Sequence, residues 1–267
     1  MDIKLVAIDL DDTLLNTSLA VSPRTQAAIA QAVAQGVNVT VATGRMYTSA
    51  LPYAKQLKLD VPLITYNGGL IRSCQSGETL YHQPVPENLA HQMLALFQEK
   101  GWYLQSYVND VLYVAERNQR ALYYETLTGI EAVALGNDFY TMPGTPTKML
   151  ALAPADEMRD IAQTTQALFG SELTICQSKP IYLEITHPLA NKGRALDFLA
   201  SRLGISRDQV MAVGDSQNDL EMIKYAGWGV AMANAADNVK AAAQAVTGHH
   251  DAEGVAEAIE TYVLKKN

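Results

Sequence analysis

The chain has 267 residues, of which 48% are hydrophobic and 18% are charged, and its formal net charge is -8. This composition predicts a folded protein with a large core and excludes a disordered chain. The acidic excess argues against a nucleic-acid partner, because phosphate backbones bind basic surfaces. A small anionic ligand would need a local site that reverses the sign of this charge.

Disulfides, secretion and membrane insertion are not expected either. The two cysteines, Cys74 and Cys176, lie far apart and form no CxxC pattern, which is typical of a reducing compartment. The first apolar run, from Leu5 to Ile8, is too short for a signal peptide, and no window approaches the roughly 18 apolar residues of a membrane span. We expect a soluble, cytoplasmic protein with no membrane partner and no obligate protein partner.

The N-terminal part alternates short apolar runs with helical patterns. Ser22-Pro23 is a helix start signal and Gly36 is a stop signal. The patterns predict buried strands over 3–10, 37–43 and 61–68, and helices over 25–34 and 46–58. Strand and helix in alternation predict a doubly wound parallel sheet.

The same alternation returns near the C-terminus, whereas the middle third contains hairpins. Late helices are predicted over 192–203, 218–226, 236–245 and 254–264, with strands over 209–213 and 229–232. The middle third predicts helices over 86–100, 117–127 and 155–169, a strand over 148–153, and hairpins over 102–116 and 173–186. Hairpins mean antiparallel pairing. We therefore predict an α/β core with a Rossmann-like sheet over 1–83 and 189–267, interrupted by an α+β domain over 84–188.

Four polar segments lie where open parallel sheets bind ligands, at the carboxyl ends of strands. The first is Asp9-Leu10-Asp11-Asp12-Thr13, directly after the first strand. Residues two apart on an extended chain point to one side, so Asp9 and Asp11 are expected to face one pocket. Paired carboxylates favour a divalent cation. The alternative is that Asp11 and Asp12 merely begin a loop.

The other three segments offer groups that bind phosphate or metal. Thr43-Gly44-Arg45 combines a hydroxyl, a glycine amide and a helix start, although an ordinary turn has the same pattern. Lys192 opens a helix against the helix dipole, which is reasonable if it neutralises an anion; a solvated lysine is the alternative. The segment 214–219, GDSQND, offers oxygen ligands of the kind that Mg²⁺ takes, while its serine could also cap the next helix.

With these segments in one order, the sequence resembles the haloacid dehalogenase-like superfamily, and within it the Cof-type sugar-phosphate phosphatases. The resemblance covers essentially the whole chain and rests on DLDDTLL, ATGR, YNG, LEI, NKG, VGDSQNDLEMI and GVAEAI. It implies a type C2 cap inserted into the core. It also implies a Mg²⁺-dependent hydrolase that acts on small phosphorylated metabolites, with sugar phosphates as the expected substrates.

The resemblance implies a role for each motif residue. Asp9 would attack phosphorus and form an aspartyl phosphate, and Asp11 would protonate the leaving group and then activate water. The phosphoryl oxygens would be held by the Leu10 amide, Thr43, the Gly44 amide, Lys192 and Asn218. Mg²⁺ would bind Asp9, the Asp11 main-chain carbonyl and Asp215, with Asp219 and Arg45 in supporting positions.

One residue departs from the family pattern, and two other functions stay open. Cof-type members commonly have glycine where this chain has Asp12, which we interpret as an adjustment of the backbone and not as loss of activity. A phosphotransferase or mutase with the same phospho-aspartate is the nearest alternative. A non-enzymatic phospho-acceptor of the receiver type is a second one, but receivers are single domains of roughly 120 residues.

Two further features lie outside the core motifs. Glu184 and Lys179 flank the turn of the last hairpin, which leads into Asn191-Lys192, and are candidate substrate contacts in the inserted domain. The pair His249-His250 looks like a metal site, but no acidic or cysteine partner stands at ligand spacing. We expect this pair to lie in a solvated loop.

Overall fold

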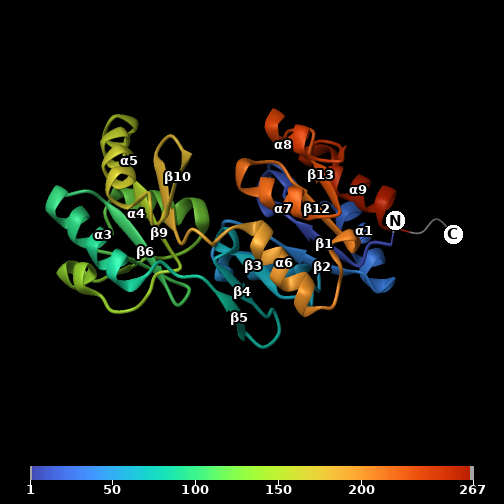
Figure 1. The fold of residues 1–267 in the computed structure, drawn as a ribbon, viewed down its shortest axis with the longest axis horizontal. Coiled ribbons are helices and arrows are strands. Elements are labelled where there is room, and N and C mark those ends of the chain that lie inside the picture. Colours follow the sequence, from blue (N-terminus) through green and yellow to red (C-terminus); the bar gives the residue numbers. More distant parts are fainter. Residues whose placement is uncertain (1, 265–267) are drawn as a thin grey trace. The chain divides into compact units, whose positions relative to one another are not determined.

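The computed structural model describes residues 2–264 and divides into two compact units (Figure 1). The core unit contains Met1–Tyr81 and Asn191–Asn267, and the inserted unit contains His82–Ala190. None of the helices in the described part of the chain combines the length and the apolar character that crossing a membrane requires.

The core unit contains a five-stranded parallel sheet in the order β14-β13-β12-β1-β2. Its strands are β1 (Leu5–Ile8), β2 (Asn38–Val41), β12 (Val210–Gly214), β13 (Trp228–Ala231) and β14 (Ala245–Val246). The helices are α1 (Pro23–Ala34), α2 (Tyr47–Gln56), α6 (Lys192–Arg202), α7 (Leu220–Tyr225), α8 (Asp237–Ala242) and α9 (Gly254–Tyr262). The predicted α/β class is confirmed.

The central strand β1 determines where the polar segments leave the sheet. All four of its residues are fully buried, as expected for a parallel strand that is covered on both faces. Leu5 and Ala7 belong to the cluster that packs under α6. Ile8 pairs with Val41 on one side and with Val213 on the other. The segments that follow these three residues therefore leave the sheet at the same edge.

The third predicted strand is only partly correct. Within 61–68, the strand β3 spans Leu63–Thr65 and meets the parallel sheet through a bridge between Ala42 and Ile64. It forms an antiparallel sheet with β4 (Leu70–Arg72) and β5 (Thr79–His82), two strands that the sequence patterns did not predict. The tight turn at Tyr66–Gly68 sends the chain back along β3.

The inserted unit has a six-stranded sheet in the order β10-β11-β9-β6-β7-β8. Its strands are β6 (Leu104–Val108), β7 (Val111–Val114), β8 (Val133–Ala134), β9 (Lys148–Leu152), β10 (Thr174–Lys179) and β11 (Tyr182–Thr186). Its helices are α3 (Glu87–Lys100), α4 (Gln119–Thr128) and α5 (Ala155–Phe169). Both hairpins are antiparallel as predicted, whereas β8 pairs with β7 in parallel.

One face of this second sheet packs on helices. Phe97 of α3 and Ile161 of α5 share a buried cluster with Met149 and Ile185 of the sheet. Because side chains alternate along a strand, the neighbours of these sheet residues point to the other face. That face therefore carries Lys148 of β9 and Glu184 of β11.

Candidate active site

A buried lysine joins two carboxylates at the edge of the core sheet. Lys192 Nζ donates to Asp9 Oδ1 and to Asp219 Oδ1, each at 2.5 Å. Lys192 and Asp219 have no exposed surface, and Asp9 is 5% exposed. In such a buried group each charge depends on its partners, because an unpaired charge away from water is costly.

The start of α6 fixes the position of this lysine. Asn191 caps the helix, since its Oδ1 accepts a hydrogen bond from the Arg194 amide at 2.8 Å. The turn at Gly68 packs directly against this cap. Gly68 has φ +92°, and a Cβ atom there would lie 2.3 Å from the Asn191 carbonyl oxygen. Glycine at position 68 therefore permits the close approach of the turn to the start of α6.

The loop after β12 is organised by Asp219. Its Oδ2 accepts hydrogen bonds from the amides of Asp215 and Ser216, both at 3.0 Å. Its other oxygen binds Lys192, so one carboxylate connects the loop to the lysine. The Thr13 hydroxyl donates to Asp215 Oδ1 at 2.9 Å and ties the first motif to this loop.

Three carboxylates gather here as a candidate cation site. Asp9, Asp215 and Asp219 each offer an oxygen, and these atoms lie within 4.8 Å of one another. Burial, together with the charge of Asp219, raises the pKa of Asp9 well above its ordinary value. The same two causes raise the pKa of Asp215 to about 7. Crowded carboxylate oxygens are hard ligands, so the donor set fits the expected Mg²⁺.

This crowding predicts how stability without metal depends on pH. An acid whose pKa is raised by folding binds more protons in the folded state, so its contribution to stability falls as pH rises. For Asp215 the fall should lie between about pH 4 and pH 7. In EDTA, we expect Asp215→Asn to raise the free energy of unfolding relative to the wild type. This increase should be larger at pH 8 than at pH 5, by about 1–2 kcal/mol after solvent screening. Urea unfolding at the two pH values measures this.

The matched control is Asp60→Asn, which changes an exposed carboxylate of the same unit. Its effect on the free energy of unfolding should be the same at pH 5 and at pH 8. If Asp215→Asn changed the free energy of unfolding equally at pH 5 and pH 8, the ionised carboxylate of Asp215 would not destabilise the folded protein, and the prediction would be wrong. In the wild type, added Mg²⁺ should reduce the loss of stability at pH 8, because a bound cation favours the ionised carboxylates.

Strand alternation predicts that the side chain of Asp11 faces the same pocket as Asp9, but the structure pairs Asp11 with Arg45. Arg45 binds its carboxylate with two nitrogens, Nε to Oδ2 at 2.9 Å and Nη2 to Oδ1 at 2.5 Å. The strand β1 ends at Ile8, and the chain then turns through residues 10–14. The side-chain alternation of the strand therefore does not reach Asp11, and its carboxylate is not part of the three-carboxylate cluster.

Asp12 occupies a backbone conformation that favours glycine. Its φ is +57°, in the left-handed region, which aspartate tolerates better than most residues do. The residue is exposed, and its carbonyl accepts a hydrogen bond from Asn234 Nδ2 at 2.8 Å. The turn geometry is thus the physical reason for a glycine-like position here.

Asn67 brings two of the predicted phosphate-binding segments together. Its Oδ1 accepts from Asn218 Nδ2 at 2.9 Å, and a Cβ atom on Gly44 would lie 2.8 Å from the same oxygen. Thr43 is fully buried, and its hydroxyl accepts from the Arg45 amide at 3.1 Å. No role was predicted for Asn67, although the YNG segment that contains it was a motif.

In the inserted unit, Glu184 pairs with a lysine that sequence reasoning missed. Lys148 Nζ lies 3.6 Å from Glu184 Oε2 and 5.1 Å from the ring centre of Tyr107, and Lys148 is 5% exposed. Burial alone would lower the pKa of Lys148, but the charge of Glu184, the nearby Tyr124 and a hydrogen bond to Glu184 together outweigh burial and leave the pKa raised. The other candidate, Lys179, is exposed and lies over the ring of Tyr182.

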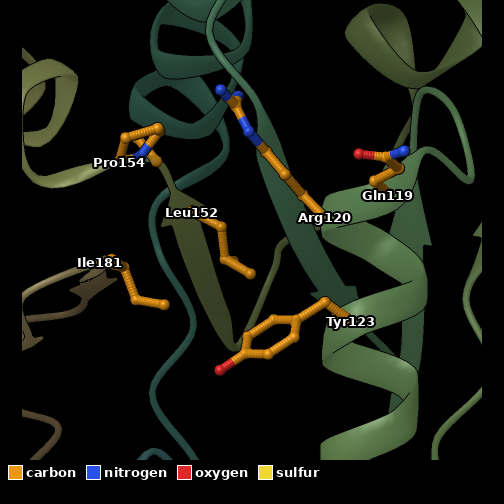
Figure 2. Close-up of a pocket in the computed structure, with 7 residues that line it drawn as sticks. Gln119, Arg120, Tyr123, Leu152, Pro154 and Ile181 are labelled. Atoms are coloured by element: carbon orange, nitrogen blue, oxygen red, sulfur yellow. The ribbon is translucent and has the colours of Figure 1, made fainter.

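A separate pocket of about 280 Å³ lies in the inserted unit (Figure 2). In Figure 2 the ring of Tyr123 extends from α4 towards the end of β9. The lining is formed by Gln119, Arg120, Tyr123, Leu152, Ala153, Pro154 and Ile181. None of these residues belongs to the polar segments of the core, so this pocket is not the candidate active site.

Comparisons with known proteins find hydrolases and phosphatases that match nearly the whole chain. The model of the haloacid dehalogenase-like hydrolase family matches residues 6–259. A 5-amino-6-(5-phospho-D-ribitylamino)uracil phosphatase of Bacillus subtilis is 34% identical over 266 residues, with 99% of this chain and 97% of the relative covered. A pyridoxal phosphate phosphatase of Escherichia coli is 28% identical over 285 residues, covering 99% and 100%. A haloacid dehalogenase-like hydrolase of Bacteroides thetaiotaomicron has a similar structure, with a TM-score of 0.89, 29% identity and coverage of 97% and 99%.

Proposed function

The chain belongs to the haloacid dehalogenase-like hydrolase family, and on this premise we propose that it is a Mg²⁺-dependent phosphatase of small phosphorylated metabolites. The observation that carries the proposal is the buried Asp9–Lys192–Asp219 group beside Asp215. Relatives whose substrates are a phosphorylated ribityl compound and pyridoxal phosphate support the substrate class. Within this class we propose phosphorylated sugars and polyols.

The first step is an attack by Asp9 on phosphorus. A new bond forms between a carboxylate oxygen and phosphorus, and the bond between phosphorus and the leaving oxygen breaks. Lys192 already holds Asp9 Oδ1 at 2.5 Å, which orients the carboxylate and offsets the charge of the incoming dianion. The amides of Leu10 and Gly44 and the side chains of Thr43 and Asn218 would bind the phosphoryl oxygens.

Asp11 moves the proton in both steps. It gives a proton to the leaving oxygen, and then takes one from the water that attacks phosphorus and frees Asp9. The two contacts from Arg45 occupy both oxygens of the Asp11 carboxylate. The acid step therefore requires the guanidinium to release Asp11 when substrate binds, and we infer that the substrate phosphate competes for Arg45.

Asp9, Asp215 and the Asp11 carbonyl would hold Mg²⁺, with Asp219 in support through its contacts with the 215–216 amides. When bound, the ion supplies positive charge that offsets the repulsion between the substrate dianion and the carboxylates. Lys192 supplies the other positive charge at the same place, so a chain of net charge -8 can bind an anion.

The proposed activity is tested by phosphate release from a panel of phosphorylated sugars, polyols, nucleotides and cofactors. We expect turnover that requires Mg²⁺ and is abolished by EDTA. Transfer of the phosphoryl group to a second sugar instead of water would show a phosphotransferase or mutase. No release from any compound of the panel, with the protein folded and Mg²⁺ present, would contradict the proposal.

A second prediction concerns Glu184 and Lys148 and is measured with the same panel of phosphorylated compounds. We propose that this pair, formed by the buried Lys148 and the partly exposed Glu184, recognises polar groups of the leaving alcohol together with Tyr107. Glu184→Gln keeps the size of the side chain but removes its charge, and should change the ratio of kcat/KM between substrates by at least about tenfold. Lys179→Ala, on the same hairpin, tests the exposed candidate beside it.

These outcomes separate recognition from a purely structural role. A structural pair would lower stability and affect every substrate by the same factor, which urea unfolding and the panel would detect together. Unchanged ratios for Glu184→Gln would remove Glu184 from substrate recognition. If Lys179→Ala changed the ratios of kcat/KM between substrates and Glu184→Gln did not, substrate recognition would be assigned to Lys179.

A further inference from the structure

The histidine pair before α9 has an acidic neighbour that the sequence did not predict. Asp251 Oδ2 lies 3.9 Å from His249 Nδ1 and 3.7 Å from His250 Nε2. His249 Nδ1 already accepts a hydrogen bond from the Asp251 amide, and the centres of the two rings lie 4.5 Å apart. The expectation that the pair lacks an acidic partner is therefore wrong, but these three residues do not offer three free ligand atoms.

The turn at 66–68, which follows β3, contacts all three of the other segments that we propose for the phosphate site. The amide of Asn67 donates to the Thr43 carbonyl at 3.0 Å. The last residue of the turn packs on the cap of α6, the helix that Lys192 opens. The side chain of Asn67 reaches Asn218 in the loop after β12. A single turn thus joins segments that are far apart in the sequence.

The backbone of this turn is unusual. Tyr66, Asn67 and Gly68 have φ values of +53°, +56° and +92°, so three successive residues lie in the left-handed region. Asparagine and glycine tolerate this conformation, whereas a tyrosine rarely adopts it. The ring of Tyr66 is fully buried, and its amide donates to the Arg45 carbonyl at 2.9 Å. Because such a conformation persists only where its surroundings hold it, the fold fixes the place of the Asn67 side chain.

The Asn67 side chain determines which end of the Asn218 amide is presented. Only the NH₂ group of Asn218 can donate to a phosphoryl oxygen, whereas its carbonyl oxygen would repel one. Asn67 Oδ1 can only accept, and it accepts from Asn218 Nδ2 at 2.9 Å. At the other end of the amide, Ser216 Oγ donates to Asn218 Oδ1 at 2.7 Å. These two contacts fix the orientation of the amide, and the NH₂ group keeps a second hydrogen for a phosphoryl oxygen.

Glycine at position 44 makes room for the same oxygen of Asn67. A Cβ atom on Gly44 would lie 2.8 Å from Asn67 Oδ1, closer than real Cβ contacts allow. Any side chain at position 44 would therefore displace Asn67 from Asn218. The position of Asn67 thus depends on the absence of a side chain in the neighbouring phosphate-binding segment.

We propose that Asn67 is a positioning residue of the phosphate site, which holds the donor end of the Asn218 amide in place for a phosphoryl oxygen. This inference rests on the proposed phosphatase function. A donor that is held in place before the substrate binds needs no reorganisation during the reaction. Since Asn67 acts through Asn218, its contribution should disappear when Asn218 is removed.

The test measures the affinity of the full chain for inorganic phosphate, by calorimetry in millimolar Mg²⁺. Asn67→Gly removes the side chain but keeps the turn, because glycine adopts a φ of +56° without strain. We expect Asn67→Gly and Asn218→Ala each to raise the Kd of phosphate about tenfold, and to lower kcat/KM for the best substrate by about 10- to 100-fold. The double variant should be no weaker than Asn218→Ala alone.

The matched control is Lys58→Gly, which changes an exposed residue of the same unit with a φ of +54°. It should bind phosphate and turn over as the wild type does, and the Tm of Asn67→Gly should fall no further than that of Lys58→Gly. A purely structural role would instead lower the Tm of Asn67→Gly and weaken binding whether or not Asn218 is present.

Three results would overturn the proposal. They are wild-type affinity in Asn67→Gly, losses that add in the double variant, and a loss in Lys58→Gly equal to that in Asn67→Gly. A wild type that binds phosphate but hydrolyses no compound of the panel would contradict the phosphatase function, while the binding measurements still decide the role of Asn67. A wild type that does not bind phosphate would overturn that role as well.

Discussion

Replacing Asp9 by asparagine is expected to abolish phosphate release, with a loss of kcat on the order of 10⁴-fold or more. The amide keeps the size of the side chain and can still accept from Lys192, but it cannot attack phosphorus as a carboxylate does. Because burial raises the pKa of Asp9, the substitution removes a strained charge and should not lower the stability without metal. Steady-state phosphate release in Mg²⁺ measures the first effect, and urea unfolding in EDTA measures the second.

The matched control is Asp60→Asn, which should turn over at the wild-type rate. Mass spectrometry of the Asp9→Asn protein must exclude deamidation back to aspartate, because a trace of wild type would mimic residual activity. A folded, intact Asp9→Asn protein with wild-type turnover would remove Asp9 from the reaction.

Replacing Lys192 by methionine is expected to destabilise the protein strongly. The change keeps much of the volume and removes the charge that faces Asp9 and Asp219 at 2.5 Å. Loss of one partner from a buried ion pair typically costs about 3–5 kcal/mol. Asp9, whose pKa is already raised by burial, can then become neutral only by binding a proton, so we expect a larger loss of stability at pH 8 than at pH 5. Urea unfolding in EDTA at both pH values measures it.

Arg194→Met provides the control for this prediction. It lies on the same helix, two residues further along, and is exposed, so its effect on the free energy of unfolding should be small and independent of pH. A loss below about 1 kcal/mol for Lys192→Met, equal at both pH values, would show that the lysine does not balance the buried carboxylates.

Much of the fold could be predicted because hydrophobic period and turn signals agree along the core strands. In the run over 3–10 the polar residues, Lys4 and Asp9, lie on either side of four apolar residues. Those four residues form β1, which the structure shows fully buried. The strand β4 could not be predicted because it has only three residues, and β5 could not be predicted because none of its four residues is buried, so neither pattern shows a clear periodicity. The helix predicted over 236–245 ends at Ala242, because the edge strand β14 takes over at Ala245.

The candidate site was predictable in part, from residues that sit directly after strands. The carboxylates of Asp9, Asp215 and Asp219 gather as the sheet register requires. The partner of Asp11 was not predictable, because the turn after Ile8 breaks the strand alternation. The pairing of Lys148 could have been predicted, because a lysine at the start of an otherwise apolar strand needs a partner for its charge.

The most direct test of the account is to trap the phosphoryl group on the enzyme. Wild-type protein is mixed with its best substrate and Mg²⁺, quenched in acid during turnover, reduced with borohydride and digested for mass spectrometry. We predict that the peptide containing Asp9 carries the reduced form of an acyl phosphate, homoserine in place of aspartate, and that the Asp9→Asn protein lacks it. Rapid turnover with this peptide unmodified, or with the phosphoryl group on another residue, would contradict Asp9 as the nucleophile.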